Sequence, residues 1–343
     1  MKSAKVKRKA YASAGVDVDL GNRLKGGIQG IVRKTHGPQV LGRIGGFGAL
    51  FRVNFKSMRD PVLVSSIDGV GTKLKVAFAL NKHDTVGADL VNHCVNDIAV
   101  VGARPLFFLD YIGCEKLAVP VFHQLLRGFS RACSIAGCAL IGGETAQMPG
   151  MYRKGEYDLA GCIVGVVDRA HLIDGQKIKA GDVILGLSSN GLHTNGYSLA
   201  REILFKKMRL SPSSRLPGSR SSIGQELLRV HKNYQPLLAK VPPGIIKGLA
   251  HITGGGLIDN LPRILPRNCD AVIDTKSWRA PRIFEVLQQN GKVDPEEMYQ
   301  VFNMGIGMVA IVAERDAKRV MAALKAKRIG RIERGRGKTR LLF

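Results

Sequence analysis

The amino-acid sequence predicts an α/β fold made of two α/β domains. Short apolar strands alternate with helical patterns along the chain. The 343 residues exceed what one hydrophobic core usually organises, which favours two domains. A break with turn residues and charges, RAHLIDGQKIKAGD, separates two alternating regions. We therefore expect an N-terminal domain over residues 1–169 and a C-terminal domain over residues 170–343.

The N-terminal region predicts four strands and two helices. Each expected strand is a short run of apolar and β-branched residues, and each expected helix has apolar residues at helical spacing. The strands are PVLVSSI, PLFFLDYIG, ALIGG and DLAGCIVGVV, and the helices span residues 85–101 and 119–136.

The C-terminal region repeats this alternation. The strand DVILGLSS opens it, and the apolar run from Met304 to Ala313 predicts a buried strand. The last residues, KAKRIGRIERGRGKTRLLF, predict a terminal hairpin because apolar positions flank a glycine-rich turn. Further helices are expected over residues 197–208 and 223–238, with the loop LSPSSRLPGSRSS between them, and from Leu257.

Composition narrows the class of protein. The hydrophobic fraction of 45% indicates a folded globular chain, and no apolar run approaches the ~18 residues of a membrane helix. The first residues lack the apolar segment of a secretory signal, and the six cysteines form no CxxC pair. We expect a cytoplasmic protein with reduced thiols that binds no membrane. A short organellar presequence stays a weaker alternative.

The net charge of +25 raises the question of a polyanionic partner. The 52 basic residues are scattered, and aromatic residues make up only 6% of the chain. Single-strand binders interleave basic and aromatic residues, and that pattern is not found here. We expect no specific nucleic-acid partner, although a basic nucleic-acid-binding protein is the alternative from a different class.

The first segment with candidate functional residues is SSIDGVGTKLKVA, which follows an expected strand. Its glycines allow backbone amides to approach an anion, Lys73 offers a positive charge, and Asp68 can hold a metal. The spacing GxxxxGK(S/T) of a Walker loop is absent. An ordinary glycine turn before a helix is the competing interpretation.

The second segment lies on the helix expected over residues 85–101. Four polar residues recur there at helical spacing and share one face: Asp89, His93, Asn96 and Asp97. Such a face is usually solvated. However, residues 97–105 have the form DxxxxGAxP, in which Gly102 is expected to end the helix.

The pattern DxxxxGAxP resembles the ATP-binding signature of the aminoimidazole ribonucleotide synthetase family. Further blocks typical of that family appear in order and cover the chain from Tyr11 to the last strand. These are YASAGVDVDLGN, GGFGALF, DGVGTKL, HDTVGADLVNHCVND, GGETAQMPGMY, LSSNGLHTNGYSL, HITGGGLIDNLPR and EMYQVFNMGIGM.

This resemblance implies a homodimer in which the N-terminal domain forms the interface, with ATP bound close to it. It also implies the reaction. ATP phosphorylates the formamide oxygen of formylglycinamidine ribonucleotide, an amidine nitrogen attacks the activated carbon, and phosphate leaves as the imidazole ring closes. The chemistry needs ATP because phosphate is a good leaving group and an amide oxygen is a poor one.

The resemblance also implies roles for individual residues. Mg²⁺ is expected on the carboxylates of Asp68, Asp97 and Glu144, since hard cations prefer oxygen ligands. Lys73, His193 and Asn195 are the expected catalytic residues: Lys73 would offset phosphate charge, and His193 would polarise the formyl oxygen or relay a proton. The ATP-binding set is Asp68, Gly69, Gly71, Thr72, Lys73, Asp97, Gly102, Ala103 and Pro105, and the substrate phosphate is expected on Thr253, Gly254, Gly255 and Gly256. A tight turn before the helix from Leu257 is the competing interpretation of these glycines.

One departure and several relatives keep alternatives open. Gln29 stands where bacterial family members commonly carry a lysine near the nucleotide, and Lys25 or Lys34 is a candidate to compensate. The resemblance also extends to selenophosphate synthetase, thiamine-monophosphate kinase and formylglycinamidine ribonucleotide synthetase, which share the ATP scaffold. Selenophosphate synthetase usually has a reactive cysteine in its N-terminal stretch, whereas the first cysteine here is Cys94.

Overall fold

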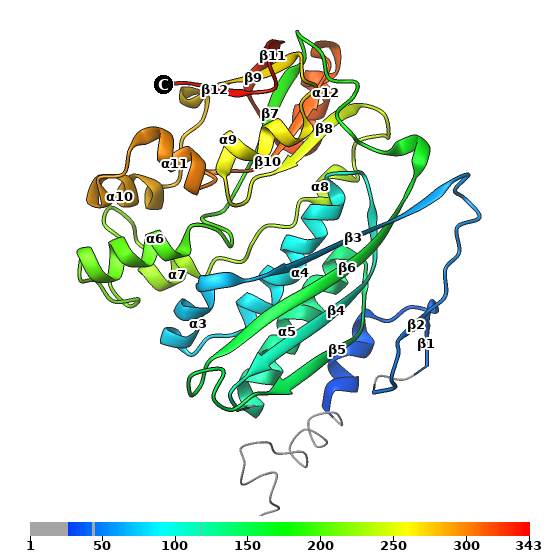
Figure 1. Ribbon diagram of the computed structural model, residues 1–343, viewed down its shortest axis with the longest axis vertical. Helices are drawn as coiled ribbons and strands as arrows, with labels where there is room; N and C mark the ends of the chain where they lie inside the picture. The colour runs from blue at the N-terminus through cyan, green and yellow to red at the C-terminus, as the bar shows by residue number, and fades with distance from the viewer. Residues whose placement is uncertain (1–26, 43–44, 117) are drawn as a thin grey trace, which may run out of the picture.

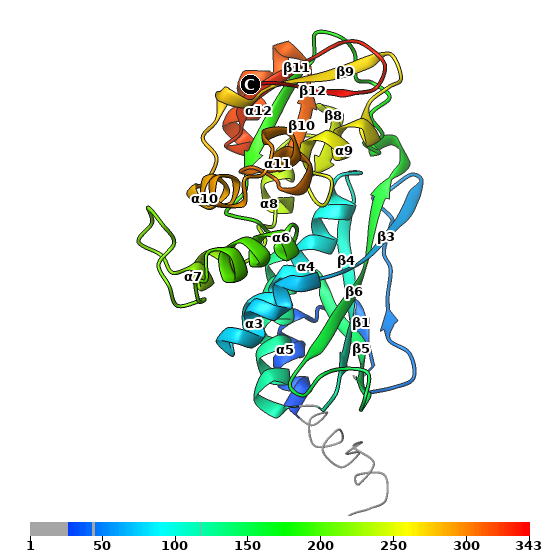
Figure 2. The same cartoon turned by 60° about the vertical axis from the view of Figure 1, so that its left-hand side comes forward.

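The N-terminal domain is a four-stranded sheet with two helices on one face. The computed structural model describes residues 27–42, 45–116 and 118–343, so the block from Tyr11 and Lys25 lie outside the described residues. The sheet order is β3-β6-β4-β5. Figure 1 shows the sheet in front of helices α4 and α5, and Figure 2 shows the two layers from the side. The strands are β3 (Pro61–Gly69), β6 (Tyr157–Asp168), β4 (Arg104–Cys114) and β5 (Ala139–Gln147), and the helices are α3 (Leu74–Leu80), α4 (Asp84–Ala99) and α5 (Val119–Ala136).

Successive side chains along each strand point to opposite faces of the sheet, and this alternation decides which residues contact the helices. On β4 and β6, Phe108, Ile112 and Ile163 are fully buried against α4 and α5. Their neighbours in sequence point to the other face, which no helix of the described residues covers (Figure 1). A short ribbon, β1 (Val40–Leu41) paired with β2 (Leu50–Phe51), lies beside this sheet.

The C-terminal domain is a six-stranded mixed sheet with helices on both faces. Its order is β12-β9-β11-β7-β10-β8. On β7, Val183 and Leu185 pack on one side and Ile184 on the other, so both faces are buried. The strands are β7 (Val183–Ser188), β8 (Ile246–His251), β9 (Cys269–Asp274), β10 (Ile306–Val312), β11 (Lys327–Arg334) and β12 (Thr339–Leu342), and the main helices are α6 (Tyr197–Arg201), α9 (Gly256–Asn260), α10 (Arg282–Gly291), α11 (Pro295–Val301) and α12 (Glu314–Leu324).

Two sequence expectations in this domain were wrong. The tail does not form a hairpin, because β11 and β12 pair on opposite sides of β9 and not with each other. The helix expected over residues 223–238 is two short helices, α7 (Ile223–Leu227) and α8 (Gln235–Leu238), separated by an extended segment. That segment forms its hydrogen bonds with the N-terminal domain, and this tertiary pairing outweighs the local helical pattern.

Other expectations were confirmed. Strand β10 is completely buried, and α5 has the expected bounds. The two-domain α/β class is confirmed as well, while the boundary at residue 169 stays a prediction. Among the described residues, no helix is both long and apolar enough to cross a membrane.

Candidate functional site

A segment of the C-terminal domain is bound by the polar face of helix α4. Residues 229–234, which we call the strap, run along this face and place their backbone groups opposite its side chains. The face is therefore a buried domain contact and not a solvated surface: Asp89 and Asn96 are fully buried. The contacts are His231 N to Asp89 Oδ1 (2.6 Å), Asn92 Nδ2 to His231 O (2.7 Å), Asn96 Nδ2 to Lys232 O (2.8 Å) and Tyr234 N to Asn96 Oδ1 (2.9 Å).

Lys73 lies beneath the strap and is fully buried. Its ammonium contacts Asp89 Oδ2 at 2.8 Å and donates to the carbonyls of His193 (3.1 Å) and Arg229 (2.7 Å). Burial lowers the pKa of Lys73 and raises the pKa of Asp89, and their mutual attraction opposes both shifts. With three oxygens around it, Lys73 is not positioned for the direct phosphate contact expected from the sequence. It joins the two domains.

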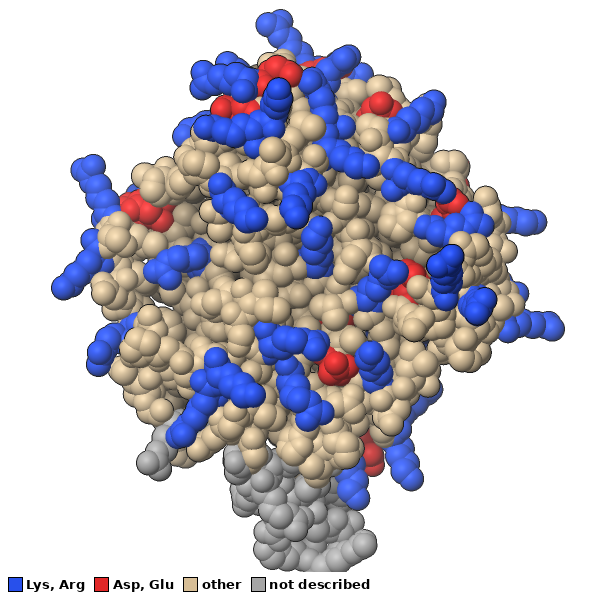
Figure 3. All heavy atoms as spheres, turned by 180° about the vertical axis from the view of Figure 1, so that it is seen from behind, with Lys and Arg blue, Asp and Glu red and all other residues tan. Residues whose placement is uncertain are grey.

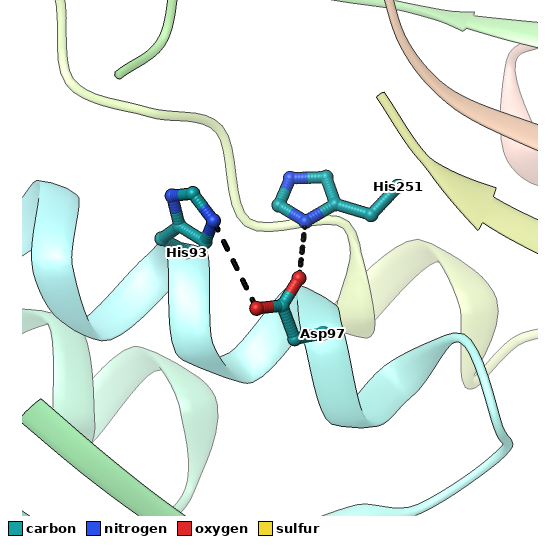
Figure 4. Close-up of side chains that lie close together, drawn as sticks. All are labelled: His93, Asp97 and His251. Carbon is teal, nitrogen blue, oxygen red and sulfur yellow. Dashed lines mark hydrogen bonds and ion pairs between the residues drawn. The ribbon is translucent and has the colours of Figure 1, made fainter. Parts of the chain in front are cut away.

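Above this ion pair, Asp97 begins a chain of hydrogen bonds. Its Oδ1 accepts from His251 Nδ1 at 2.8 Å, and Oδ2 accepts from the hydroxyl of Ser66 at 3.2 Å. His251 is the last residue of β8, so this contact links the C-terminal sheet to α4. The Nε2 atoms of His251 and His231 lie 2.9 Å apart. Figure 4 shows the imidazoles of His251 and His93 directed toward the Asp97 carboxylate.

The chain continues to Asp68 at the end of β3. The hydroxyl of Thr194 lies 3.2 Å from His231 Nδ1 and 2.8 Å from His93 Nδ1. His93 Nε2 then lies 2.8 Å from Asp68 Oδ2 and 3.8 Å from Asp97 Oδ2. Three imidazoles and one hydroxyl thus connect the carboxylate of Asp97 to that of Asp68, and His93 lies close to both.

The chain of hydrogen bonds from Asp97 to Asp68 needs one more proton than its neutral groups supply. Each of its five contacts needs one hydrogen, whereas three neutral imidazoles and one hydroxyl supply four. One imidazole is therefore charged when every contact is formed and both carboxylates are ionised. The nearby carboxylates raise the pKa of His93 against the effect of burial, whereas burial lowers the pKa of His231 and of His251. His93, which contacts both carboxylates, is the residue that holds the charge.

His193, one of the expected catalytic residues, lies behind His231. Its ring stacks on His231 with centroids 4.1 Å apart, and only 1% of the residue is exposed. Neither ring nitrogen has a hydrogen-bond partner among the described residues. Burial holds its pKa well below the usual value, so the ring is neutral. Its φ of 62° is in the left-handed region. Unsatisfied nitrogens and strained backbone together are typical of functional positions.

The turn expected to bind the substrate phosphate lies next to the loop that carries His193 and Asn195. Asn195 Oδ1 is close to Gly254, because a Cβ added at Gly254 would lie 3.5 Å from it. Gly255 and Gly256 have φ of 94° and 57°, and a Cβ on Gly256 would come within 1.9 Å of the Tyr299 carbonyl. The glycines are thus required by the tight turn itself. Phosphate binding there stays a prediction.

The expected ATP-binding residues divide into two groups. Asp68, Gly69, Gly71, Thr72 and Asp97 lie at or beside the domain junction, where Thr72 Oγ1 is 3.1 Å from Ser198 Oγ. The end of the signature has different neighbours: Gly102 has φ of 84° and packs against the backbone of His171. Ala103 and Pro105 are buried at the start of β4, so they shape the turn between α4 and β4.

Glu144, the third expected Mg²⁺ ligand, lies on the other face of the sheet. Asp68 is in register with Gly161 and Asp110, and Asp110 with Gly143, so these four share the helix-covered face. Glu144 follows Gly143 and points the opposite way, and two strands separate its strand from that of Asp68. Within one chain the expected ligand set is therefore not assembled.

Sequence reasoning missed His251, His231 and Thr194, and it treated His93 as part of a polar face. His251 and Thr194 lie inside recognised blocks, so the blocks themselves were the available signal. Nothing local marks His231, because its position depends on how the strap docks on α4.

The fold and this junction define a two-domain α/β protein with a polar site between its domains. The chain matches the family models for AIR synthase related proteins, the N-terminal domain over residues 49–167 and the C-terminal domain over residues 179–341. It therefore belongs to the AIR synthase related family.

Curated relatives match over nearly the full length of both chains. A phosphoribosylformylglycinamidine cyclo-ligase of Syntrophotalea carbinolica is 51% identical over 93% of this chain and 91% of its own. A protein of the same name from Thermoanaerobacter pseudethanolicus is 50% identical over 95% of this chain and 98% of its own.

Solved structures with lower identity share the fold. The hydrogenase maturation protein HypE in complex with ATP superposes with a TM-score of 0.66 at 18% identity, covering 94% of this chain and 90% of that chain. The thiamine-monophosphate kinase from Stenotrophomonas maltophilia gives 0.65 at 18% identity, covering 94% and 95%.

Proposed function

We propose that this protein is an ATP-dependent cyclo-ligase that converts formylglycinamidine ribonucleotide to 5-aminoimidazole ribonucleotide, with release of ADP and phosphate, in purine biosynthesis. The observation that carries the proposal is the identity of about 50% to cyclo-ligases across both domains. Thiamine-monophosphate kinase shares the fold at 18% identity, so the fold alone does not favour a kinase reaction.

The junction offers groups suited to this reaction. We propose that His193 and Asn195 contact the formamide of the substrate once the strap moves away from His193. A neutral imidazole can donate one proton and accept another, which suits an oxygen being phosphorylated while a nitrogen becomes a nucleophile. The unpaired nitrogens of His193 and the unpaired Asn195 Nδ2 support this role.

Lys73 and Thr194 act through other residues. Lys73 holds the strap and Asp89 in place, so we assign it a positioning role and not a phosphate contact. Thr194 fixes the ring orientations of His93 and His231 through its hydroxyl. Substrate phosphate on Thr253 to Gly256 is kept in the proposal because glycine turns present backbone amides to anions.

Mg²⁺ enters the proposal as the partner of ATP. In one chain the carboxylates of Asp68 and Asp97 each face an imidazole nitrogen, and Glu144 is on the opposite face. Mg²⁺ prefers an all-oxygen environment, so these residues do not fit a dedicated Mg²⁺ site. We assign no step of the reaction to a protein-bound Mg²⁺.

We also propose a homodimer formed through the uncovered face of the N-terminal sheet. Leu63 and Ile67 on β3 are 61% and 72% exposed. In register with Ile67 lie Cys162 and Leu109, which extend the same apolar face across the sheet. Exposed apolar faces of this kind mark protein–protein interfaces.

Two further expectations remain part of the proposal. Lys and Arg side chains spread over the face in Figure 3 with few acidic residues between them, which supports weak, salt-sensitive attraction for polyanions and no specific nucleic-acid site. All six cysteines are free thiols, which supports the cytoplasm as the compartment.

A product assay with a matched variant tests the function. Formylglycinamidine ribonucleotide, ATP and Mg²⁺ should give the aminoimidazole product and one phosphate per ring. Asp97→Asn keeps the size and one acceptor oxygen, so its melting temperature should stay near wild type. Turnover should fall by about 10²- to 10³-fold, as expected when a preorganised charge is lost from a site. A stable phosphorylated product without an imidazole would indicate a kinase instead.

A further inference from the structure

We propose that His93, His251, Asp97 and Asp68 form a binding site for a divalent d-block metal ion such as Zn²⁺ or Co²⁺, which bridges the two domains. The proposal does not depend on the ligase reaction. It starts from the disagreement between an expected Mg²⁺ site and the nitrogen atoms found around its carboxylates.

Three of the four proposed ligands already lie close together. One ligand atom each from His93, His251 and Asp97 lies within 4.8 Å of the other two. A tetrahedral ion at about 2.0–2.1 Å from each ligand needs them about 3.4 Å apart. His251 Nδ1 lies 2.8 Å from Asp97 Oδ1, and His93 Nε2 lies 3.8 Å from Asp97 Oδ2. These distances lie on either side of that value, so small side-chain shifts bring the three residues to one ion.

Asp68 is the fourth ligand of the proposed set. It does not belong to the three residues whose ligand atoms lie within 4.8 Å of one another, so its carboxylate shifts toward them when the ion binds. Its Oδ2 lies 2.8 Å from His93 Nε2, and its Oδ1 accepts from the amide of Gly69 at 2.6 Å. That amide holds Oδ1, so Oδ2 is the oxygen available to the ion. The resulting set of two nitrogens and two oxygens is one in which Zn²⁺ and Co²⁺ are stable and which Mg²⁺ disfavours.

Each ligand also has the outer contact that metal ligands typically have. His93 uses its other ring nitrogen on Thr194, and His251 uses its other ring nitrogen on His231. Asp97 accepts a second hydrogen bond from Ser66. In metal centres such contacts orient the imidazoles and carboxylates before the ion binds, and losing one typically weakens affinity 10- to 100-fold.

The charge of the site favours a divalent cation. Among the described residues, no lysine or arginine forms an ion pair with Asp68 or Asp97, whereas the neighbouring Asp89 is paired with Lys73. An incoming ion displaces the extra proton of His93, and the two carboxylates and two neutral imidazoles that remain carry a charge of minus two. Both histidines are at most 6% exposed, so this charge lies in a poorly solvated place that a divalent ion neutralises.

An ion between the domains should stabilise the folded protein. His93, Asp97 and Asp68 belong to the N-terminal domain, and His251 belongs to β8 of the C-terminal domain. An ion held by both domains binds the folded state and not the unfolded chain. It should therefore raise the melting temperature by several degrees when it is in excess.

Titration of the chelator-treated full chain with Co²⁺ tests the proposal. We expect one Co²⁺ per chain with the intense visible absorption of tetrahedral coordination, displacement by Zn²⁺, and no displacement by excess Mg²⁺. His251→Asn and His93→Gln should lose the band, and His171→Asn, an exposed histidine outside the site, should keep it. Thr194→Val, which retains every ligand, should bind Co²⁺ 10- to 100-fold more weakly.

Several results would overturn the proposal. They are an absence of stoichiometric Co²⁺ binding to wild type, a thiolate-to-cobalt absorption band that assigns the ion to cysteine, or equal competition by Mg²⁺. If His251→Asn or His93→Gln unfolds, Thr194→Val decides: wild-type affinity in this variant contradicts the site.

Discussion

Lys73 and Asp89 form an ion pair of 2.8 Å in which neither side chain is exposed. The pair lies where the turn that contains Lys73, helix α4 and the strap meet. Burying both charges is favourable only because each satisfies the other and because Lys73 also donates to two backbone carbonyls.

Breaking this pair should destabilise the protein strongly. Lys73→Met leaves Asp89 buried without a cation, which costs about 3–5 kcal/mol in the free energy of unfolding. The control Lys75→Met removes a half-exposed pair with Glu156 and should cost less than about 1 kcal/mol. Urea unfolding compares the two variants. Equal stabilities would show that Lys73 does not join the domains.

Replacing His193 should separate stability from activity. His193→Leu removes two unsatisfied buried nitrogens, each costing about 1–3 kcal/mol, and this gain exceeds the extra left-handed backbone strain of about 1–2 kcal/mol. We expect an unchanged or higher melting temperature and a loss of about 10²- to 10⁴-fold in kcat. His171→Leu should change neither quantity. Retained turnover in well-folded His193→Leu would exclude a catalytic role.

Asp110 should make stability depend on pH. It lines a cavity of about 70 Å³ with Phe122 and Leu126, and burial raises its pKa from 3.8 to about 7. Because the folded pKa is the higher one, the folded state favours the protonated acid. Its contribution is complete below pH 3.8 and is lost as the pH rises toward 7.

The variant Asp110→Asn removes that titration. Its melting temperature relative to wild type should therefore increase between pH 5 and pH 8. Parallel pH profiles for the two proteins would mean that the carboxyl is solvated in the folded state.

The uncovered sheet face should control the oligomeric state. Ile67→Glu places a charge in the centre of the proposed interface and should convert the dimer to a monomer in light scattering. Ile135→Glu changes another exposed isoleucine, which lies on α5 and is 62% exposed, and should leave the dimer intact. A monomeric wild type, or a dimer that tolerates Ile67→Glu, would contradict the interface.

Individual strands and helices were predicted from the sequence better than the contacts between them. Strand β10 and helix α5 follow from apolar periodicity, which is a local property. The pairing of β12 with β9 depends on contacts far apart in sequence, so the tail resembled a hairpin. The strap is extended because Asn92 and Asn96 bind its backbone, and no pattern within residues 223–238 carries that information.

The candidate site was predicted in part for the same reason. Asp68 and Asp97 follow from spacing on a strand and a helix. The role of Lys73 was misjudged because a lysine beside a glycine turn suggests an anion, whereas burial against Asp89 is visible only in three dimensions. Glu144 was grouped with the two aspartates by its conspicuous block, although strand alternation directs it to the opposite face.

Isotope tracing tests the proposed reaction most directly. The substrate would carry a heavy oxygen isotope in its formyl group, and the released phosphate would be examined by mass spectrometry. If ATP activates the formyl oxygen before ring closure, one labelled oxygen passes to each phosphate, and the ring product contains none of it. Unlabelled phosphate with the label in water would contradict the phosphorylated intermediate and, with it, the assignment as a cyclo-ligase of this mechanism.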